Sequence, residues 1–117
     1  MIEGTVSEQG VPSIELEIAG RRWVAVIDTG FNGDLELPAA LRNDLAGQFV
    51  GRVTSLLAAD QAIEEDLYLV DFPFDGEVLR TEATFATVNE VLVGTRLLRH
   101  HRLEIDFPNR TVAIERV

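Results

Sequence analysis

The sequence has 117 residues, 46% of them apolar, and carries 20 acidic against 10 basic residues, for a net charge of -10. This length suits one domain spanning residues 1–117, and the apolar fraction is too high for a disordered acidic tail. The charge argues against a nucleic-acid partner, because phosphate binding needs a basic surface. The absence of cysteine excludes disulfides, thiolate metal sites and a cysteine nucleophile.

The N-terminal stretch MIEGTVSEQG is acidic and does not resemble a signal peptide. No segment contains the roughly 18 consecutive apolar residues that a membrane span needs. We therefore predict a soluble cytoplasmic protein without a membrane partner.

The first half of the chain alternates apolar and polar residues, which is typical of strands. Ile14, Leu16 and Ile18 form one apolar face, and the segment 19–22 predicts a hairpin turn. Residues 23–28 are apolar on both faces, so we expect a central strand that is covered on both sides.

A short strand at 35–37 leads into the segment PAALRNDLA at 38–46, which predicts a brief helix. Pro38 suits the first turn of such a helix, and Gly47 suits its C-terminal cap. Beyond it, alternating runs around 49–57 and 63–71 predict a long hairpin.

Residues 58–61 are the expected tip of that hairpin, and Asp75-Gly76 predicts the turn of a second hairpin. Strand character returns at 78–88.

The C-terminal part begins with an apolar strand predicted at 91–94, followed by a short helix predicted at 95–101. Two closing strands, RLEIDF and TVAIERV, flank a turn at 108–110. The sum predicts a mainly β domain, a small closed β-barrel or sandwich with one or two short helices.

The stretch VAVIDTG at 24–30 raises a chemical question, because it drives the carboxylate of Asp28 toward an apolar core. A buried charge is costly unless it is paired or shifts its pKa. One interpretation is structural: Asp28 starts a turn, and Thr29 forms a local hydrogen bond. The other is catalytic: a rigid strand presents the carboxylate, and Gly30 allows close approach to the backbone.

A second stretch, VLVGTRLL at 91–98, completes an ordered pair of motifs with VAVIDTG. Together they resemble the retropepsin-like (clan AA) aspartic proteases, in particular the small single-domain prokaryotic type. In that family an apolar strand enters Asp-Thr/Ser-Gly, a hairpin flap follows, and two apolar residues with Gly precede a Leu-containing helix. The segment DTGFNGDLELP and the closing hairpin also look like that type.

The resemblance implies a homodimeric aspartic endopeptidase of the retropepsin fold, with peptide or protein substrates and no cofactor. We expect no metal site, because the His and carboxylate residues have no recognisable ligand spacing. One protomer supplies one Asp28, so the implied catalytic pair is Asp28 from each chain, sharing one proton. Thr29 would brace the two active-site loops across the dimer, and Gly30 would lie close to the substrate backbone. An extended peptide would bind between loops and flaps.

Two features depart from the family pattern. Phe31 follows Asp-Thr-Gly where many retropepsins have Ala or Ser, so its ring either narrows a substrate pocket or turns into the core. The expected tip reads Ala-Ala-Asp-Gln rather than glycine-rich, and Ala59 and Asp60 are the tip residues expected near substrate.

Two alternatives to a peptidase remain open. A dimerisation or peptide-binding module could keep the fold and lack turnover. A phosphate-handling enzyme is remoter, because the chain is too short for an actin-like ATPase and Gly30 stands where phosphoaspartyl enzymes have a second Asp.

Overall fold

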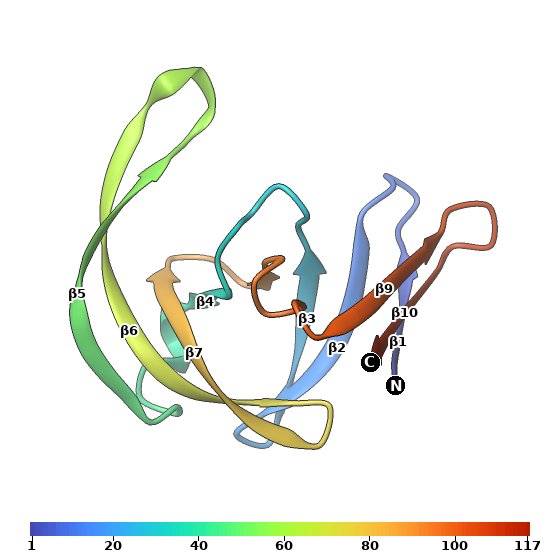
Figure 1. Ribbon diagram of the computed structural model, residues 1–117, viewed down its shortest axis with the longest axis horizontal. Coiled ribbons are helices and arrows are strands. Elements are labelled where there is room, and N and C mark those ends of the chain that lie inside the picture. The colour runs from blue at the N-terminus through green and yellow to red at the C-terminus, as the bar shows by residue number, and fades with distance from the viewer.

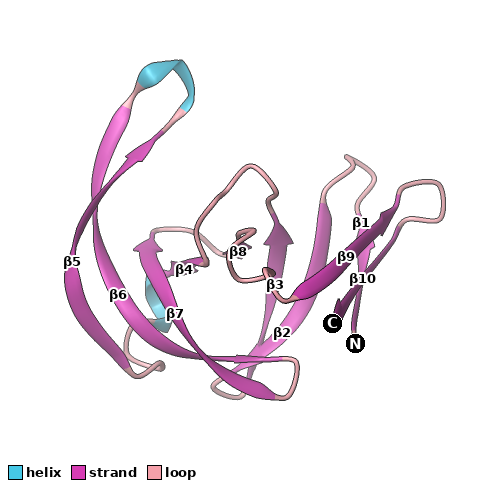
Figure 2. Ribbon diagram, in the orientation of Figure 1, coloured by secondary structure: helices cyan, strands magenta, loops and turns pink.

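The computed structural model describes all 117 residues as ten strands and two single-turn 3₁₀ segments (Figures 1 and 2). In chain order the elements are β1 (Ile2–Val6), β2 (Pro12–Ile18), β3 (Arg21–Ile27), β4 (Leu35–Pro38), η1 (Ala39–Leu41), β5 (Gly47–Leu56), η2 (Ala58–Asp60), β6 (Ala62–Phe74), β7 (Glu77–Ala86), β8 (Val91–Val93), β9 (His101–Asp106) and β10 (Thr111–Arg116). The mainly β prediction is confirmed. Neither 3₁₀ segment approaches the length and apolarity of a helix that could cross a membrane.

All ten strands belong to one sheet in the order β5-β6-β7-β4-β8-β3-β2-β1-β10-β9. Neighbours are antiparallel except for two parallel pairs, β3 with β8 and β4 with β7. Strands β5 and β9 form the two edges, so the sheet is open and the expectation of a closed barrel is wrong. The parallel pairs lie at the centre of the order, where Asp28 follows β3.

The hairpin predictions rest on turn chemistry and are confirmed. Ala19 (φ 51°) and Gly20 (φ 79°) connect β2 to β3, while Asp75 (φ 51°) and Gly76 (φ 77°) connect β6 to β7. Positive φ at both central residues matches the twist of flanking antiparallel strands, and glycine adopts it without steric cost.

The two halves of the sheet share one hydrophobic core. Ile14 on β2, Phe72 on β6 and Ile114 on β10 are each at most 1% exposed and belong to a single cluster of 20 buried residues. Because these strands are far apart in the sheet order, the sheet must curl to bring them together. The chain termini lie close to each other, since β1 pairs with β10 (Figure 1).

The hairpin formed by β5 and β6 extends from this core as a curved arm (Figure 1). Its inner and outer sides alternate along each strand, as a period of two requires. The predicted hairpin at 49–71 is thereby confirmed.

The helix predicted at 38–46 is wrong, since only Ala39–Leu41 makes a single 3₁₀ turn. Pro38 belongs to β4, where it is paired with Ala86, and Gly47 begins β5 instead of capping a helix. A helix in a small protein needs an apolar face to bury, and the three residues after Leu41 are all exposed.

The helix predicted at 95–101 is replaced by successive turns. The N–H groups of Leu98, Arg99 and His101 each donate to the carbonyl three residues earlier. Leu97 and Leu98 are both buried, but β9 already begins at His101, so no residues remain to extend the turns into a helix.

Strand β3 is central in the sheet, as predicted, but it is not covered on both sides. Its alternate residues Trp23, Ala25 and Ile27 are buried, whereas Val24 is 41% exposed. Continuous apolar character therefore identified the position of β3 in the sheet and overstated its burial.

Candidate active site

Asp28 follows the last residue of β3 and is held by the parallel neighbour of that strand. Ile27 is paired with Val93 on β8, and the Asp28 N–H donates to the Val93 carbonyl at 2.9 Å. The backbone of Asp28 is therefore fixed by the centre of the sheet, while its side chain is half-buried at the sheet's end.

The Asp28 side chain also shapes its own loop. Its Oδ1 accepts the Gly30 N–H at 2.9 Å, and its carbonyl accepts the Phe31 N–H at 3.1 Å. This side-chain turn is the structural interpretation of the motif, and it also orients the carboxylate beside Gly30. The two interpretations are compatible, because a carboxylate has further acceptor sites for a second partner.

The loop after Asp28 interlocks with the segment after β8. The Gly94 N–H donates to the Asp34 carbonyl at 2.9 Å, and the Thr95 N–H donates to the Phe31 carbonyl at 2.9 Å. These backbone bonds join residues 60 and 64 positions apart, so they hold the segments that follow the two sequence motifs together.

Gly94 is required by this contact. A Cβ at position 94 would lie 2.0 Å from the Gly33 carbonyl oxygen and 2.8 Å from the Phe31 carbonyl oxygen. The Phe31 ring lies against both glycines: it would be 2.8 Å from a Cβ at Gly94 and 2.7 Å from a Cβ at Gly33. Phe31 is half-buried, so its ring packs on the two glycines and also remains at the surface of the loop.

A cleft of about 370 Å³ opens beside Asp28, between the loop and the β5–β6 hairpin. The loop and the sheet floor contribute Asp28, Gly30, Phe31, Gly33, Asp34, Leu35, Glu36, Glu82, Thr84 and Leu92. The hairpin contributes Val53, Ser55, Leu56, Leu57, Ile63, Glu65 and Leu67. The cleft is thus walled by the arm seen in Figure 1.

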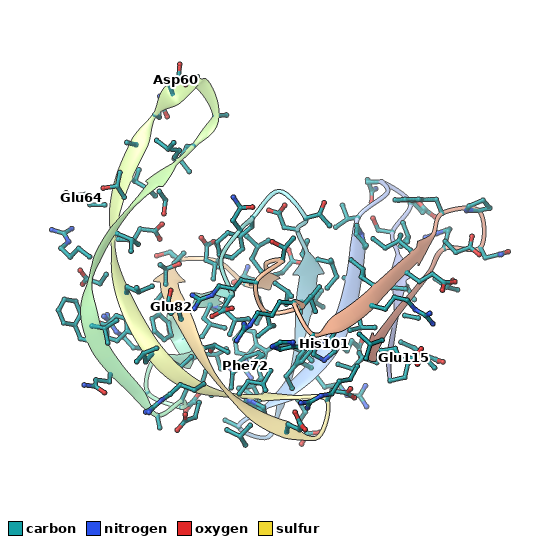
Figure 3. All side chains as sticks on the ribbon, viewed as in Figure 1. Asp60, Glu64, Phe72, Glu82, His101 and Glu115 are labelled. Carbon is teal, nitrogen blue, oxygen red and sulfur yellow. The ribbon has the colours of Figure 1, made fainter.

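Of the residues singled out in the sequence, Asp28, Gly30 and Phe31 line the cleft. Ala59 and Asp60 do not: they are exposed at the tip of the arm, where Figure 3 shows Asp60. Thr29 is exposed next to Asp28 and is not part of the lining. The hairpin residues at the cleft therefore lie below the tip, toward the sheet.

The hairpin tip adopts a left-handed backbone without glycine. Ala59 has φ 62° and Asp60 has φ 59°. Positive φ is uncommon outside glycine and costs conformational energy. The turn expected at this tip therefore forms without glycine, and its backbone is strained.

Asp34 is a site residue that the sequence did not reveal. Its side chain is only 4% exposed, its Oδ2 accepts the Glu82 N–H at 2.9 Å, and the guanidinium groups of Arg96 and Arg99 lie 3.9 and 3.7 Å from its carboxylate. Arg96 also pairs with Glu82 at 2.8 Å. An acidic residue before a short strand looks like a turn residue, so only the tertiary fold identifies these partners.

Glu36, two residues further along, has an unusual electrostatic environment. Burial raises the pKa of Glu36, and the negative charge of Glu65 raises it further. Glu36 belongs to β4 and Glu65 to β6, so the two carboxylates approach the cleft from its floor and from its hairpin wall.

No protein-family model and no curated protein matches this sequence. Among solved structures, the chain resembles a retropepsin-like aspartic protease from Rickettsia conorii, with a TM-score of 0.65 and 15% identity over 97% of this chain and 88% of that one. It also resembles a foamy viral protease-reverse transcriptase solved with an RNA/DNA hybrid, with a TM-score of 0.62 and 16% identity over 80% of this chain and 13% of that one. The chain therefore has a retropepsin-like fold.

The close contact between the loop after Asp28 and Gly94, called the interlock below, predicts that Gly94→Ala lowers the free energy of unfolding by about 1–3 kcal/mol. The added methyl group would overlap the Gly33 carbonyl. Urea denaturation measures the change. Gly30→Ala is the matched control, because its Cβ would meet only the Asp28 Oδ1, at 3.3 Å. Equal stability of Gly94→Ala and the parent chain would contradict the interlock.

Proposed function

We propose that this chain is an aspartic endopeptidase that acts as a homodimer, with the Asp28 carboxylates of two protomers side by side. The observation that carries the proposal is Asp28 itself, which ends a central strand and lines the cleft beside the hairpin arm in a retropepsin-like fold. One protomer supplies a single Asp-Thr-Gly aspartate, Asp28, whereas the chemistry of such enzymes uses a pair.

In the proposed reaction the two Asp28 carboxyls share one proton, because like charges at close range cannot both ionise easily. The ionised carboxylate takes a proton from a water molecule, and that water's oxygen attacks the carbonyl carbon of the peptide bond. The protonated carboxyl donates to the developing oxyanion. Collapse of the tetrahedral intermediate breaks the C–N bond, and the carboxyl that took the water proton passes it to the leaving amine.

Thr29 is placed to form hydrogen bonds across the twofold axis of the proposed dimer. It is exposed beside Asp28, and its hydroxyl forms no hydrogen bond within the protomer. A hydroxyl can both donate and accept, so two Thr29 side chains can bond reciprocally to the partner's loop. That bond would hold both Asp28 loops at a fixed separation.

The cleft suits an extended peptide. Eight of its 17 lining residues are hydrophobic, which favours burial of substrate side chains. The loop at Gly30 offers open backbone without a side chain, and main-chain hydrogen bonds to an extended peptide are a common recognition mode.

Replacing Asp28 with Asn should lower peptide hydrolysis by at least about 100-fold, because the amide cannot accept the water proton. The exposed Asp44→Asn variant is the control and should retain parent activity. Cleavage is measured with a mixed peptide library and mass spectrometry. An Asp28→Asn protein that cleaves as fast as the parent would refute the catalytic assignment.

Dimer stability should fall as pH rises from 4 to 9. As pH rises, loss of the shared proton places two negative charges together and weakens association. Sedimentation equilibrium across this pH range measures the dimer association constant. In the Asp28→Asn variant this constant should no longer depend on pH. A parent constant that stays flat would count against a facing pair.

A second candidate function is a peptide-binding or dimerisation module without turnover. Two observations favour it: the Phe31 ring occupies part of the cleft wall next to Asp28, and the hairpin tip is held by the strained Ala59 and Asp60. A ring at this position can exclude the attacking water, and a strained tip can resist the closure that catalysis requires.

Under the peptidase hypothesis the parent chain cleaves members of a broad peptide library between pH 3 and 8, and Phe31→Ala changes the rate without abolishing it. Under the module hypothesis the parent binds peptides and cleaves none, and Phe31→Ala restores cleavage. Calorimetric binding and product detection on the same peptides separate the two cases.

A further inference from the structure

The cleft carries strong negative charge with no compensating base in its lining. Five carboxylates line it, and none of the 17 lining residues is Arg, Lys or His. The acidic members are Asp28, Asp34, Glu36, Glu65 and Glu82. Charge alone does not define a binding site, so the surroundings of the individual carboxylates decide what this surface can bind.

Alternation along β6 separates paired from unpaired acids. Glu64 and Asp66 lie on the outer side of the hairpin, where Arg52 approaches them at 3.5 and 3.4 Å; Figure 3 shows Glu64 pointing outward. Glu65 lies between them in sequence and faces the cleft, half-buried and without an ion pair. The hairpin therefore neutralises its outer acids and leaves the inner one free.

Glu36 occupies the floor opposite that wall. In the sheet register it is paired with Leu92 on β8 and with Thr84 on β7, both of which also line the cleft. Glu36 is half-buried, and its side chain makes no ion pair or hydrogen bond within the chain. Burial and the charge of Glu65 both raise the pKa of Glu36, as expected for a carboxylate that lacks a counter-ion.

Asp34 provides an independent indication of a missing donor. Its side chain is only 4% exposed and lines the cleft. Its Oδ1 is a buried acceptor without a hydrogen bond. Arg96 and Arg99 form ion pairs with the Asp34 carboxylate at 3.9 and 3.7 Å, too far to donate the hydrogen bond that Oδ1 lacks. Asp34 lies in the bend just before β4, Glu36 lies within β4, and both residues line the cleft.

We propose that this cleft selects peptides with a positively charged side chain, arginine or lysine, seated between Glu36 and Glu65. The inference rests on the proposed function and names its substrate class. A guanidinium or ammonium group supplies several N–H donors and a full positive charge.

Such a side chain matches both parts of the cleft. Its aliphatic stem packs against the apolar lining residues Val53, Leu67 and Leu92, while its charged end relieves the repulsion between the carboxylates. A neutral side chain leaves these carboxylates without a donor, and an acidic one adds repulsion, so the cleft discriminates against both.

The test compares peptides that differ only in arginine or its neutral isostere citrulline, at each position flanking the scissile bond in turn. At one position the parent should prefer arginine by at least about 10-fold in kcat/KM, the effect of one good charge pair. Glu36→Gln and Glu65→Gln should each lower this preference several-fold. Glu64→Gln, which changes the neighbouring acid on the outer side, should preserve it.

A binding assay separates this inference from the peptidase proposal. Fluorescence anisotropy with the Asp28→Asn chain measures peptide affinity without hydrolysis. A parent that binds arginine peptides preferentially but cleaves none would overturn the peptidase proposal and support this one. Equal cleavage and equal binding of arginine and citrulline peptides would overturn this inference and leave the peptidase proposal standing. Absence of any peptide binding would overturn both.

The melting temperature of Glu36→Gln at two pH values tests whether a loss of arginine preference comes from a folding defect. Because the folded-state pKa of Glu36 is raised above its ordinary 4.5, the folded protein holds this proton more tightly, and stability is lost as pH rises through the raised value. The other charged residues that line the cleft, Asp28, Asp34, Glu65 and Glu82, are all acidic, and a neighbouring base, Arg96, is paired with Glu82 outside the lining. Glu36→Gln should therefore raise the melting temperature at pH 7 and leave it unchanged at pH 4, while its arginine preference falls. A melting temperature lowered at pH 7 would instead assign Glu36 a structural role and overturn the inference.

Discussion

The structure depends on a backbone interlock between the loop after β3 and the segment after β8. The N–H groups of Gly94 and Thr95 donate to carbonyls of Asp34 and Phe31, and the close approach is possible because Gly94 lacks a side chain. Since β3 and β8 are also parallel neighbours, the two bonds extend the order of the sheet beyond its end. Asp28 is rigid because both its strand and its loop are fixed by the same partner segment.

The same interlock explains how the large side chain of Phe31 fits directly after Asp-Thr-Gly. A Cβ at Gly33 or at Gly94 would collide with its ring, so the ring fills the space that two missing side chains leave. The sequence suggested either a pocket residue or an inward core residue, and the structure combines them: Phe31 packs on the loop backbone and lines the cleft. A large residue after Asp-Thr-Gly is therefore compatible with the loop geometry when two glycines lie beneath it.

The cleft brings together acidic side chains in surroundings that disfavour their negative charge. Asp34 is buried with one carboxylate oxygen lacking a hydrogen bond, and the pKa of Glu36 is raised by burial and by Glu65. Proteins commonly hold such unfavourable groups at functional sites, because the same groups favour a complementary ligand. On the outer side of the arm, Glu64 and Asp66 of β6 are paired with Arg52, whereas Glu65 on the cleft side has no ion pair.

The sequence by itself determined the strands, the hairpins and the position of Asp28, because period-two patterns and turn residues such as Asp75-Gly76 act over a few neighbours. Only the tertiary structure decided whether 38–46 and 95–101 became helices, since short helices depend on the face they can bury. It also decided that the sheet stays open, that Ala59 and Asp60 lie outside the cleft, and that Asp34 meets two arginines. These outcomes depend on contacts between residues far apart in the chain, which local pattern does not encode.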